Sequence, residues 1–520
     1  QWENGLFQEK IVTFFANWQF APSDTALTQA MTEGVRLRRA AGSPSPSLLT
    51  QCHLSQRERL WRNRTLCSST GNDTAMPRAL PLGELSPQVT ERARMLPAER
   101  IPNRPAPALQ SFSRNDTIRP NRNAPLPGFP VREKEANHMS MNTVPERLAA
   151  LRAAMAANGV AVYLIPVGDP HASEYLPCHY TSLTWFSGFH GENSNFVVTR
   201  TESALWADGR YFVQAEKEIA GTEIKLQRMG EPGVPTVEEY CANALNEGEA
   251  LGLCGLTAST ALVNDLKKAL EKKGAFIKTL NLEDELWTEG RPALPATPAW
   301  ILPKEYAGFS PAEKLDQLRS KLKELGCTAQ FVGKLDHLAW LLNLRAMDIE
   351  CTPYAMAYCY VTPSRAVLFI NTARVTPEAK AELEANGITL AEYDDVLKFL
   401  AAETEPQTVL AETATVNYAV YQVLEQNPAL TVKDGTDPLL MMKGVKNETE
   451  LAHTKQAHIR DAVAMVRFQI ELESRLAAGE TLTELTVDEI LHKYRSNTDK
   501  FIVESFGTIA AYGGNAAMMH

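Results

Sequence analysis

"RLAALRAAMAANGVAVYLIP" (residues 147–166) and "KLDQLRSKLKELGCTAQFVG" (residues 314–333) align without gaps at one constant offset along the chain. Four pairs of positions are identical: Leu148 and Leu315, Leu151 and Leu318, Arg152 and Arg319, Gly159 and Gly326. Apolar residues at spacings of three and four, a glycine suited to a left-handed helix end and a short apolar run predict an amphipathic helix followed by a buried strand. Because this pattern also recurs by chance in α/β proteins, the repeat needs support from the rest of the chain.

Two further pairs of segments extend the repeat. "TWFSGFHG" around Trp185 corresponds to "AWLLNLRA" around Trp340, and the strand-like "SALWADGRYF" corresponds to "AVLFINTAR". The prolines of "LWTEGRPALPATPAW" (residues 286–300) interrupt regular structure between the two copies. The sequence therefore predicts an α/β protein with two similar units, residues 141–290 and 296–443.

A third, shorter unit is expected over residues 447–520. Asn447 followed by Glu450 predicts a capped helix start, and Gly479 predicts its end. A second helix is expected at about 486–494, followed by a strand in "ESFGTIAAYGG" (residues 504–514). One apolar face of the long helix is formed by Ile459, Val463, Val466 and Ile470.

Residues 1–138 differ in composition from the rest. They carry 14 of the 31 prolines and 16 Arg against 2 Lys, with a net charge of +6 that leaves −16 for the remainder. Periodic apolar content is too low to offset the entropy lost on ordering, so we expect a disordered leader. The chain begins at Gln1, and "MSMNTVPERL" at Met139 resembles a translation start. Our hypothesis is that the leader is translated upstream sequence.

Bulk composition excludes several classes of protein. The net charge of −10 and a pI near 5.6 argue against nucleic acid as a partner. Apolar runs are too short for a membrane-spanning helix. The eight cysteines include no CxxC pair, so reduced, buried thiols in a cytoplasmic protein are expected, with a structural zinc or a disulfide as the alternative.

Two residues are singled out as candidates for chemistry. Arg210 follows a predicted strand and the turn pair Asp208-Gly209; its forked donors suit a carboxylate or a carbonyl, although it can also simply pair with Asp208. His520 follows two glycines and small residues, and a histidine there could protonate a reacting amide.

The other histidines give weaker signals. Three histidines lie close in sequence to Asp169 and Glu174: His171, His179 and His190. Their spacing fits no metal-ligand pattern, and a polar loop that frames a pocket is the favoured interpretation. His453 and His458 lie on the long helix and look like ordinary structural residues.

Seven segments occur in this order along the chain: "YLIPVGDPHASEYLP", "TWFSGFHGENSNFVVT", "ALWADGRYFVQAEKE", "WTEGRPALP", "LDHLAWLLNLRAMDIECTP", "KNETELAHTKQAHIRDAVAM" and "SFGTIAAYGGNAAMMH". Together they resemble the cytosolic three-domain aminopeptidase P (Xaa-Pro aminopeptidase) family of pita-bread metallopeptidases. The resemblance covers residues 141–520. It implies two creatinase-like domains, 141–290 and 296–443, followed by the start of a pita-bread catalytic domain at 447–520.

The family's activity is implied with its fold. That activity is removal of the N-terminal residue from peptides with proline in second position, by two divalent ions, usually manganese, that activate a shared water. The five metal ligands of the family all lie beyond the histidine that matches His520, so no metal ligand is expected in this chain. His520 then matches the substrate-binding histidine, and Arg210 matches the arginine that reaches the substrate site of a dimer partner. The resemblance implies a cytoplasmic homodimer.

Departures and alternatives remain. Ala346 stands where the family has glycine, and the leader has no family counterpart. The leading hypothesis is an incomplete copy of the aminopeptidase, inactive alone. The alternative is a non-catalytic binding protein with the same three-domain plan. A prolidase or creatinase is disfavoured because those families generally have one creatinase-like domain in front.

Overall fold

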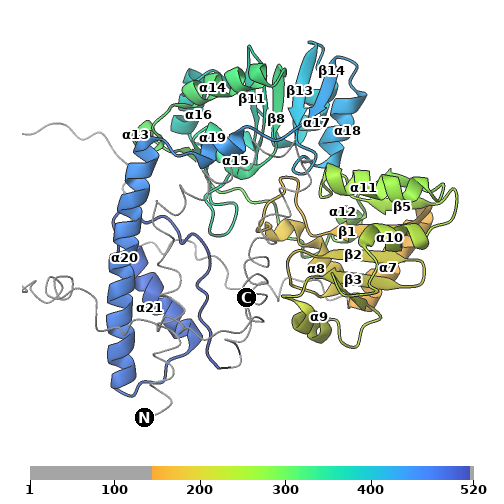
Figure 1. Cartoon of the computed structure of the whole chain (residues 1–520), viewed down its shortest axis with the longest axis horizontal. Coiled ribbons are helices and arrows are strands. Elements are labelled where there is room, and N and C mark those ends of the chain that lie inside the picture. Colours follow the sequence, from red (N-terminus) through yellow and green to blue (C-terminus); the bar gives the residue numbers. More distant parts are fainter. Residues whose placement is uncertain (1–142, 514, 516–520) are drawn as a thin grey trace, which may run out of the picture. The chain divides into compact units, whose positions relative to one another are not determined.

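The computed structural model describes residues 143–513 and 515. The predicted leader, residues 1–138, and His520 lie outside the described residues. All described residues fall in one compact unit, Gly128–His520. They contain two six-stranded mixed sheets and a long helical segment (Figure 1).

The first sheet has the strand order β4-β3-β2-β1-β5-β6. Its strands are β1 (Val160–Pro166), β2 (Asn195–Thr199), β3 (Ser203–Ala207), β4 (Lys225–Arg228), β5 (Ala250–Leu253) and β6 (Phe276–Thr279). The pairs β1-β2 and β2-β3 are antiparallel and the others are parallel. Its helices are α7 (Val144–Ala157), η2 (Cys178–Tyr180), α8 (Ser182–Ser187), α9 (Phe212–Glu218), α10 (Val237–Asn243), α11 (Thr260–Glu271) and α12 (Leu282–Leu286).

The second sheet repeats this topology as β12-β11-β10-β8-β13-β14. Its strands are β8 (Ala329–Val332), β10 (Tyr358–Val361), β11 (Ala366–Phe369), β12 (Ile388–Ala391), β13 (Gln407–Ala411) and β14 (Leu430–Asp434). β7 (Trp300–Ile301) and β9 (Leu344–Arg345) form a separate pair. The helices are α13 (Lys304–Ala307), α14 (Pro311–Glu324), α15 (Leu335–Leu341), η3 (Thr372–Arg374), α16 (Pro377–Ala385), η4 (Tyr393–Asp395), α17 (Val396–Ala401), α18 (Tyr418–Gln426) and α19 (Leu439–Gly444).

The repeated residues make repeated contacts. Gly159 and Gly326 both have positive φ, +65° and +68°, which lets the chain leave α7 and α14 in the left-handed conformation. Arg152 Nε donates to the Thr199 carbonyl and Arg319 Nε to the Thr362 carbonyl, both at 3.0 Å. The predicted helix, glycine and strand are therefore confirmed in both copies, down to one side-chain bond.

A buried cation under a tryptophan is also repeated. Arg147 donates to the Trp185 carbonyl and lies 4.7 Å from the centroid of that ring. Lys314 donates to the Trp340 carbonyl and lies 4.3 Å from the centroid of that ring. In each copy a long helix is thereby fixed to the short helix that follows the first strand, α8 or α15, with an added cation–π attraction.

Each sheet is covered on both faces. In the first, Leu148, Leu151 and Phe186 belong to one apolar cluster, and Val263 and Leu266 of α11 belong to a cluster on the opposite face. The second sheet likewise has two apolar clusters. This double cover explains why the central strands read as continuous apolar runs in the sequence.

The two α/β copies meet through equivalent loops, the one before α11 and the one before α18. The Thr260 amide donates to the Val416 carbonyl at 3.0 Å, and the Tyr418 amide donates to the Ala258 carbonyl at 2.9 Å. Gly255 packs so closely that an added Cβ would lie 3.3 Å from the Ala419 amide nitrogen. Backbone groups therefore make part of the contact between the copies, and they fix the register of the two loops.

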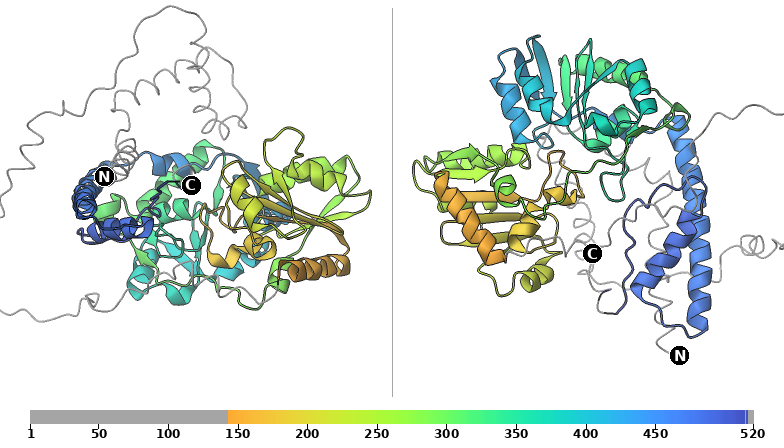
Figure 2. Two further views of the ribbon diagram at one scale, coloured as in Figure 1. Left: turned by 90° about the horizontal axis from the view of Figure 1, so that it is seen from below. Right: turned by 180° about the vertical axis from the view of Figure 1, so that it is seen from behind.

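The third segment contains α20 (Glu448–Ala477) and α21 (Glu484–Ser496), which lie side by side in both figures (Figure 2). Asn447 forms the predicted capping box with Glu450, and Gly479 has a φ of +80° just after the helix. The start of α20 is tied to the second α/β copy because Asn447 Nδ2 donates to the Ala307 carbonyl at 2.9 Å.

Two expectations for this segment differ from the structure. The described part of the predicted strand, residues 504–513, is not a strand, since no other described strand lies beside it. The face predicted from Ile459, Val463, Val466 and Ile470 is 46–60% exposed. The face packed on α21 is instead the one formed by Ala464, Phe468, Leu472 and Leu476. The long helix therefore has two apolar stripes, of which one is covered by described residues.

Cysteine burial is also only partly as expected. The six cysteines in the described range form no disulfide. Cys241, Cys254, Cys327 and Cys359 are buried, but Cys178 is exposed because it opens the surface helix η2. Among described residues, no helix is long and apolar enough to cross a membrane.

Candidate functional site

Arg210 lies where β3 ends and α9 begins. Asp208 accepts hydrogen bonds from the Arg210 amide at 2.9 Å, from Nε at 3.1 Å and from Nη2 at 2.7 Å. The sequence allowed two interpretations of Arg210, pairing with Asp208 or binding of a ligand, and the structure shows the pairing. The turn places both residues on the same side, and one third of the Arg210 side chain (33%) stays exposed.

The surroundings of this pair fix its charge state. Hydrogen bonding to Asp208 raises the pKa of Arg210. Burial raises the pKa of Asp208, but hydrogen bonds from Arg210 and Asn193 together lower it by more. The pKa of Asp208 therefore lies below its ordinary value. Asn193 Nδ2 donates to Asp208 at 2.9 Å, and the guanidinium lies 5.2 Å from the centroid of the Tyr211 ring. The result is a guanidinium held in one orientation at the protein surface by Asp208.

The three clustered histidines have different partners. His171 is buried, with Nδ1 2.8 Å from the Gly333 carbonyl and Nε2 2.8 Å from the Tyr393 hydroxyl. His179 Nδ1 is 2.7 Å from the Pro292 carbonyl, and His190 is exposed beside Glu218. Of the three, His179 lines a cavity, which fits the interpretation as a polar loop beside a pocket.

No metal centre is formed by the part of the chain that the structure describes. Within residues 143–513 and 515, no group of three or more His, Cys, Asp or Glu side chains is placed to hold a metal ion. His453, on α20, has its Nε2 3.0 Å from the Glu305 carbonyl. The described residues therefore do not fit a dinuclear metal site.

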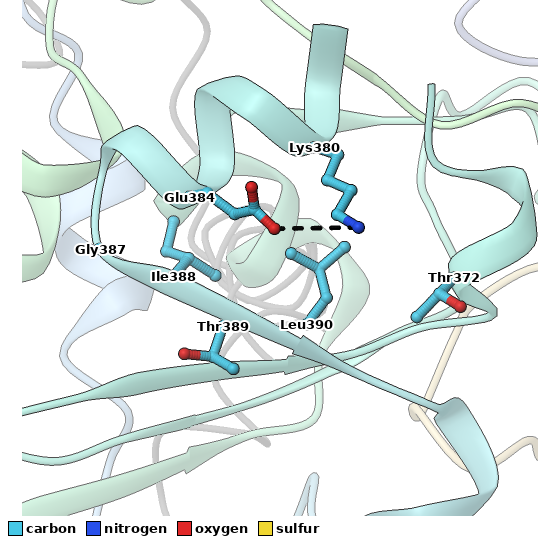
Figure 3. A pocket seen from close by; sticks show the side chains of 7 residues that line it. All are labelled: Thr372, Lys380, Glu384, Gly387, Ile388, Thr389 and Leu390. Carbon is cyan, nitrogen blue, oxygen red and sulfur yellow. Dashed lines mark ion pairs between the residues drawn. The ribbon is translucent and has the colours of Figure 1, made fainter. Parts of the chain in front are cut away.

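Two cavities lie on the α/β copies. One, of about 480 Å³, lies beside edge strand β12 and helix α16 (Figure 3). Its charged groups are Lys380 and Glu384, which are exposed and 3.9 Å apart, so it offers no buried reactive group. The second, of about 190 Å³, lies where the two copies meet and includes Glu283 and Arg291.

Glu283 was missed by sequence reasoning. It stands in "NLEDELWTEG", where acidic residues are typical of the exposed first turn of a helix. In the structure it is 3% exposed and accepts a hydrogen bond from the Tyr163 hydroxyl. Only its place between the buried residues Leu282 and Trp287 hints at this burial, and that signal is weak.

Comparison with known proteins defines the class. A family profile described as Creatinase/Prolidase N-terminal domain matches residues 147–286, and a second profile with this description matches residues 290–450. The chain is thus a protein with two creatinase/prolidase N-terminal domains, which agrees with the two sheets of equal topology.

The relatives identify the family. Aminopeptidase P2 of Arabidopsis thaliana is 34% identical over 409 residues, 72% of this chain and 58% of that protein. An Xaa-Pro aminopeptidase of Caenorhabditis elegans is 32% identical over 396 residues, 73% of this chain and 64% of that protein. The chain belongs to the Xaa-Pro aminopeptidase (aminopeptidase P) family.

A solved structure supports the same family. The crystal structure of X-prolyl aminopeptidase from Caenorhabditis elegans, described as a cytosolic enzyme with a di-nuclear active site, matches with a TM-score of 0.68 at 31% identity. The match covers 73% of this chain and 64% of that one. The chain therefore spans about three fifths of the length of these relatives.

Proposed function

We propose that this chain supplies the two creatinase-like domains, and the start of the catalytic domain, of a metal-dependent Xaa-Pro aminopeptidase. The reaction is hydrolysis of the bond between the N-terminal residue of a peptide and a proline in second position. The observation that carries the proposal is the ordered match of both domains together with 34% identity to Aminopeptidase P2 over 409 residues.

Two divalent ions, manganese in this proposal, would polarise the scissile carbonyl and lower the pKa of a bound water. The described residues hold no ligand set for them. We assign the ligands to sequence corresponding to the part of the relatives that this chain does not span, so the chain alone is expected to be inactive. The uncovered stripe of α20, formed by Ile459, Val463, Val466 and Ile470, is the surface proposed to pack on that part.

Two residues of the chain are proposed to act on the substrate. His520 would lie beside the scissile bond, where an imidazole can donate to or protonate the departing amide. Arg210, held by Asp208, would reach the substrate of the second subunit in a cytoplasmic homodimer. Its oriented fork suits a peptide carbonyl or carboxylate better than a flexible lysine would.

A chimera tests the proposal. This chain, continued from its end with the corresponding remainder of the Arabidopsis relative, should release the N-terminal residue from an Xaa-Pro peptide in Mn²⁺ and leave the Xaa-Ala peptide of the same length intact. The chain alone is the control. A chimera that folds, binds manganese and cleaves neither peptide would instead support the non-catalytic binding protein.

Arg210→Ala in the same chimera should lower kcat/KM by at least tenfold. Arg200→Ala is the matched control, since Arg200 is an exposed arginine of the same domain that pairs with Glu249. Equal activity of the two variants would contradict the role given to Arg210 while leaving the hydrolytic activity in place.

A further inference from the structure

The cavity of about 190 Å³ at the junction of the two creatinase-like domains has an unusual combination of walls. The first domain contributes Tyr180, Glu283 and Arg291, and the second contributes Tyr358, Tyr393 and Asp394. Both domains therefore line one cavity, and backbone bonds between the loops before α11 and α18 hold the domains together.

Glu283 is the most demanding group in this lining. Its side chain is buried at 3% exposure, and Oε2 accepts a hydrogen bond from Tyr163 of β1. Oε1 is buried and has no hydrogen-bond partner among the described residues. A buried carboxyl oxygen without a donor has lost its hydrogen bonds to water without gaining others, which costs free energy. A ligand that donates a hydrogen bond to it would recover this free energy.

The charges around the cavity leave a negative excess at pH 8, where Glu283 has lost its proton, since burial raises its pKa to about 7. Arg291 donates to Asp284, so these two neutralise each other. His179 does not offset the negative charge, because burial lowers its pKa and favours the uncharged ring. Glu283 and Asp394 are left without an ion-pair partner among described side chains.

The remaining wall is aromatic. The rings of Tyr358 and Tyr393 stack with centroids 5.0 Å apart, and the Tyr393 hydroxyl is 3.4 Å from that of Tyr358. Tyrosine rings offer a large apolar surface to a ligand. Leu256 and Leu397 supply apolar surface in the same lining.

We propose that this cavity binds a small organic ammonium ion, whose N–H groups donate to Glu283 and whose apolar part lies against Tyr358 and Tyr393. The acceptor without a donor and the negative excess favour a cation over an anion or a neutral molecule, and the aromatic wall favours a cation with an apolar part. The proposal concerns the junction of the two domains and does not depend on peptide hydrolysis by the complete protein.

Titration calorimetry on the full 520-residue chain tests it, with benzylammonium as the probe and benzyl alcohol as its uncharged match. At pH 8 benzylammonium should bind at least tenfold more tightly than benzyl alcohol. Because Glu283 must lose a proton to pair with the probe, binding should weaken by about tenfold at pH 6 and release a proton into the buffer. The groups that face this carboxyl are Tyr163, Cys254, Asp284 and Arg291.

Glu283→Gln should weaken benzylammonium binding at least tenfold. Glu285→Gln, an exposed neighbour on α12 outside the lining, should leave it unchanged. Leu294→Trp alters an exposed residue of the lining, so it should fold and should block the cavity even if Glu283→Gln proves unstable. Equal binding of the two probes, or binding that survives both Glu283→Gln and Leu294→Trp, would overturn the proposal.

Discussion

Replacing Glu283 with glutamine should remove the contribution of this carboxyl to the pH dependence of the first domain's stability between pH 5 and pH 8. Burial, the largest cause, raises the pKa of Glu283 to about 7 from an ordinary 4.5, while the hydrogen bond from Tyr163 acts in the opposite direction. The folded protein therefore holds this proton more tightly than the unfolded chain does. Its stabilising contribution is complete below pH 4.5 and is lost as the pH rises through 7.

The magnitude follows from the size of the shift. One pKa unit corresponds to 1.36 kcal/mol, so a rise from 4.5 to about 7 makes the free energy of unfolding fall by about 3 kcal/mol between pH 4.5 and pH 8. Glutamine cannot ionise and can still accept from Tyr163. It buries an NH₂ group without a partner, which costs about 1–3 kcal/mol. That cost is the same at every pH, so it cancels when the two pH profiles are compared.

Urea unfolding at pH 5, 6, 7 and 8, followed by tryptophan fluorescence, measures this difference. Trp287 and Trp185 stack with ring centroids 5.5 Å apart in the core of the first domain. The fluorescence change that disappears in Trp287→Phe is assigned to unfolding of this domain. Glu285→Gln is the control because Glu285 is exposed on the same helix. Parallel profiles for the wild type and Glu283→Gln would refute the inference that folding holds this carboxyl neutral.

Three further outcomes are expected. Lys314→Ala leaves the Trp340 carbonyl and Asn343 Oδ1 without their donor, so urea unfolding should show the second domain destabilised by about 3 kcal/mol. Lys321→Ala, on the exposed side of α14, should change the free energy of unfolding by less than about 0.5 kcal/mol. Equal effects of the two variants would contradict a buried role for Lys314. Asn447→Ala should cost about 1 kcal/mol and speed proteolysis at the start of α20, and an unchanged cleavage rate would show that the cap is dispensable. Gly255→Val should loosen the contact between the two domains, because the valine side chain would collide with Ala419. Hydrogen exchange at the Thr260 and Tyr418 amides should then accelerate, while amides inside β1 stay protected. Unchanged exchange at Thr260 and Tyr418 would contradict a role of Gly255 in the contact between the domains.

The fold was predictable from the sequence because the repeat preserves side chains with local tasks. Leu148 and Leu315 fill equivalent places in two cores, and Arg152 and Arg319 bond to equivalent carbonyls. Arg147 and Lys314 occupy the same position in the two aligned segments. The alignment did not indicate that they are buried, since two exposed cations would give the same pattern. Their burial under tryptophan rings is a tertiary fact.

The candidate site was less predictable, for a physical reason. Hydrophobic periodicity locates apolar faces, but it does not say which face is covered. On α20 it identified the stripe of Ile459 and Val466, while the covered stripe is that of Phe468 and Leu472. Glu283 shows the same limit for polar groups, because a carboxylate in a helix start is ordinarily solvated.

The segments after β3 and β11 place an arginine in two different surroundings. After β11 the arginine, Arg374, turns inward with a side chain that is 4% exposed and forms an ion pair with the buried Asp348. After β3 the arginine, Arg210, pairs with its neighbour Asp208 and keeps one third of its side chain in solvent. A pair with this much exposure contributes little to stability. The arginine of the first domain is therefore the one that an external ligand can reach, which is compatible with the proposal that Arg210, and not Arg374, acts on the substrate.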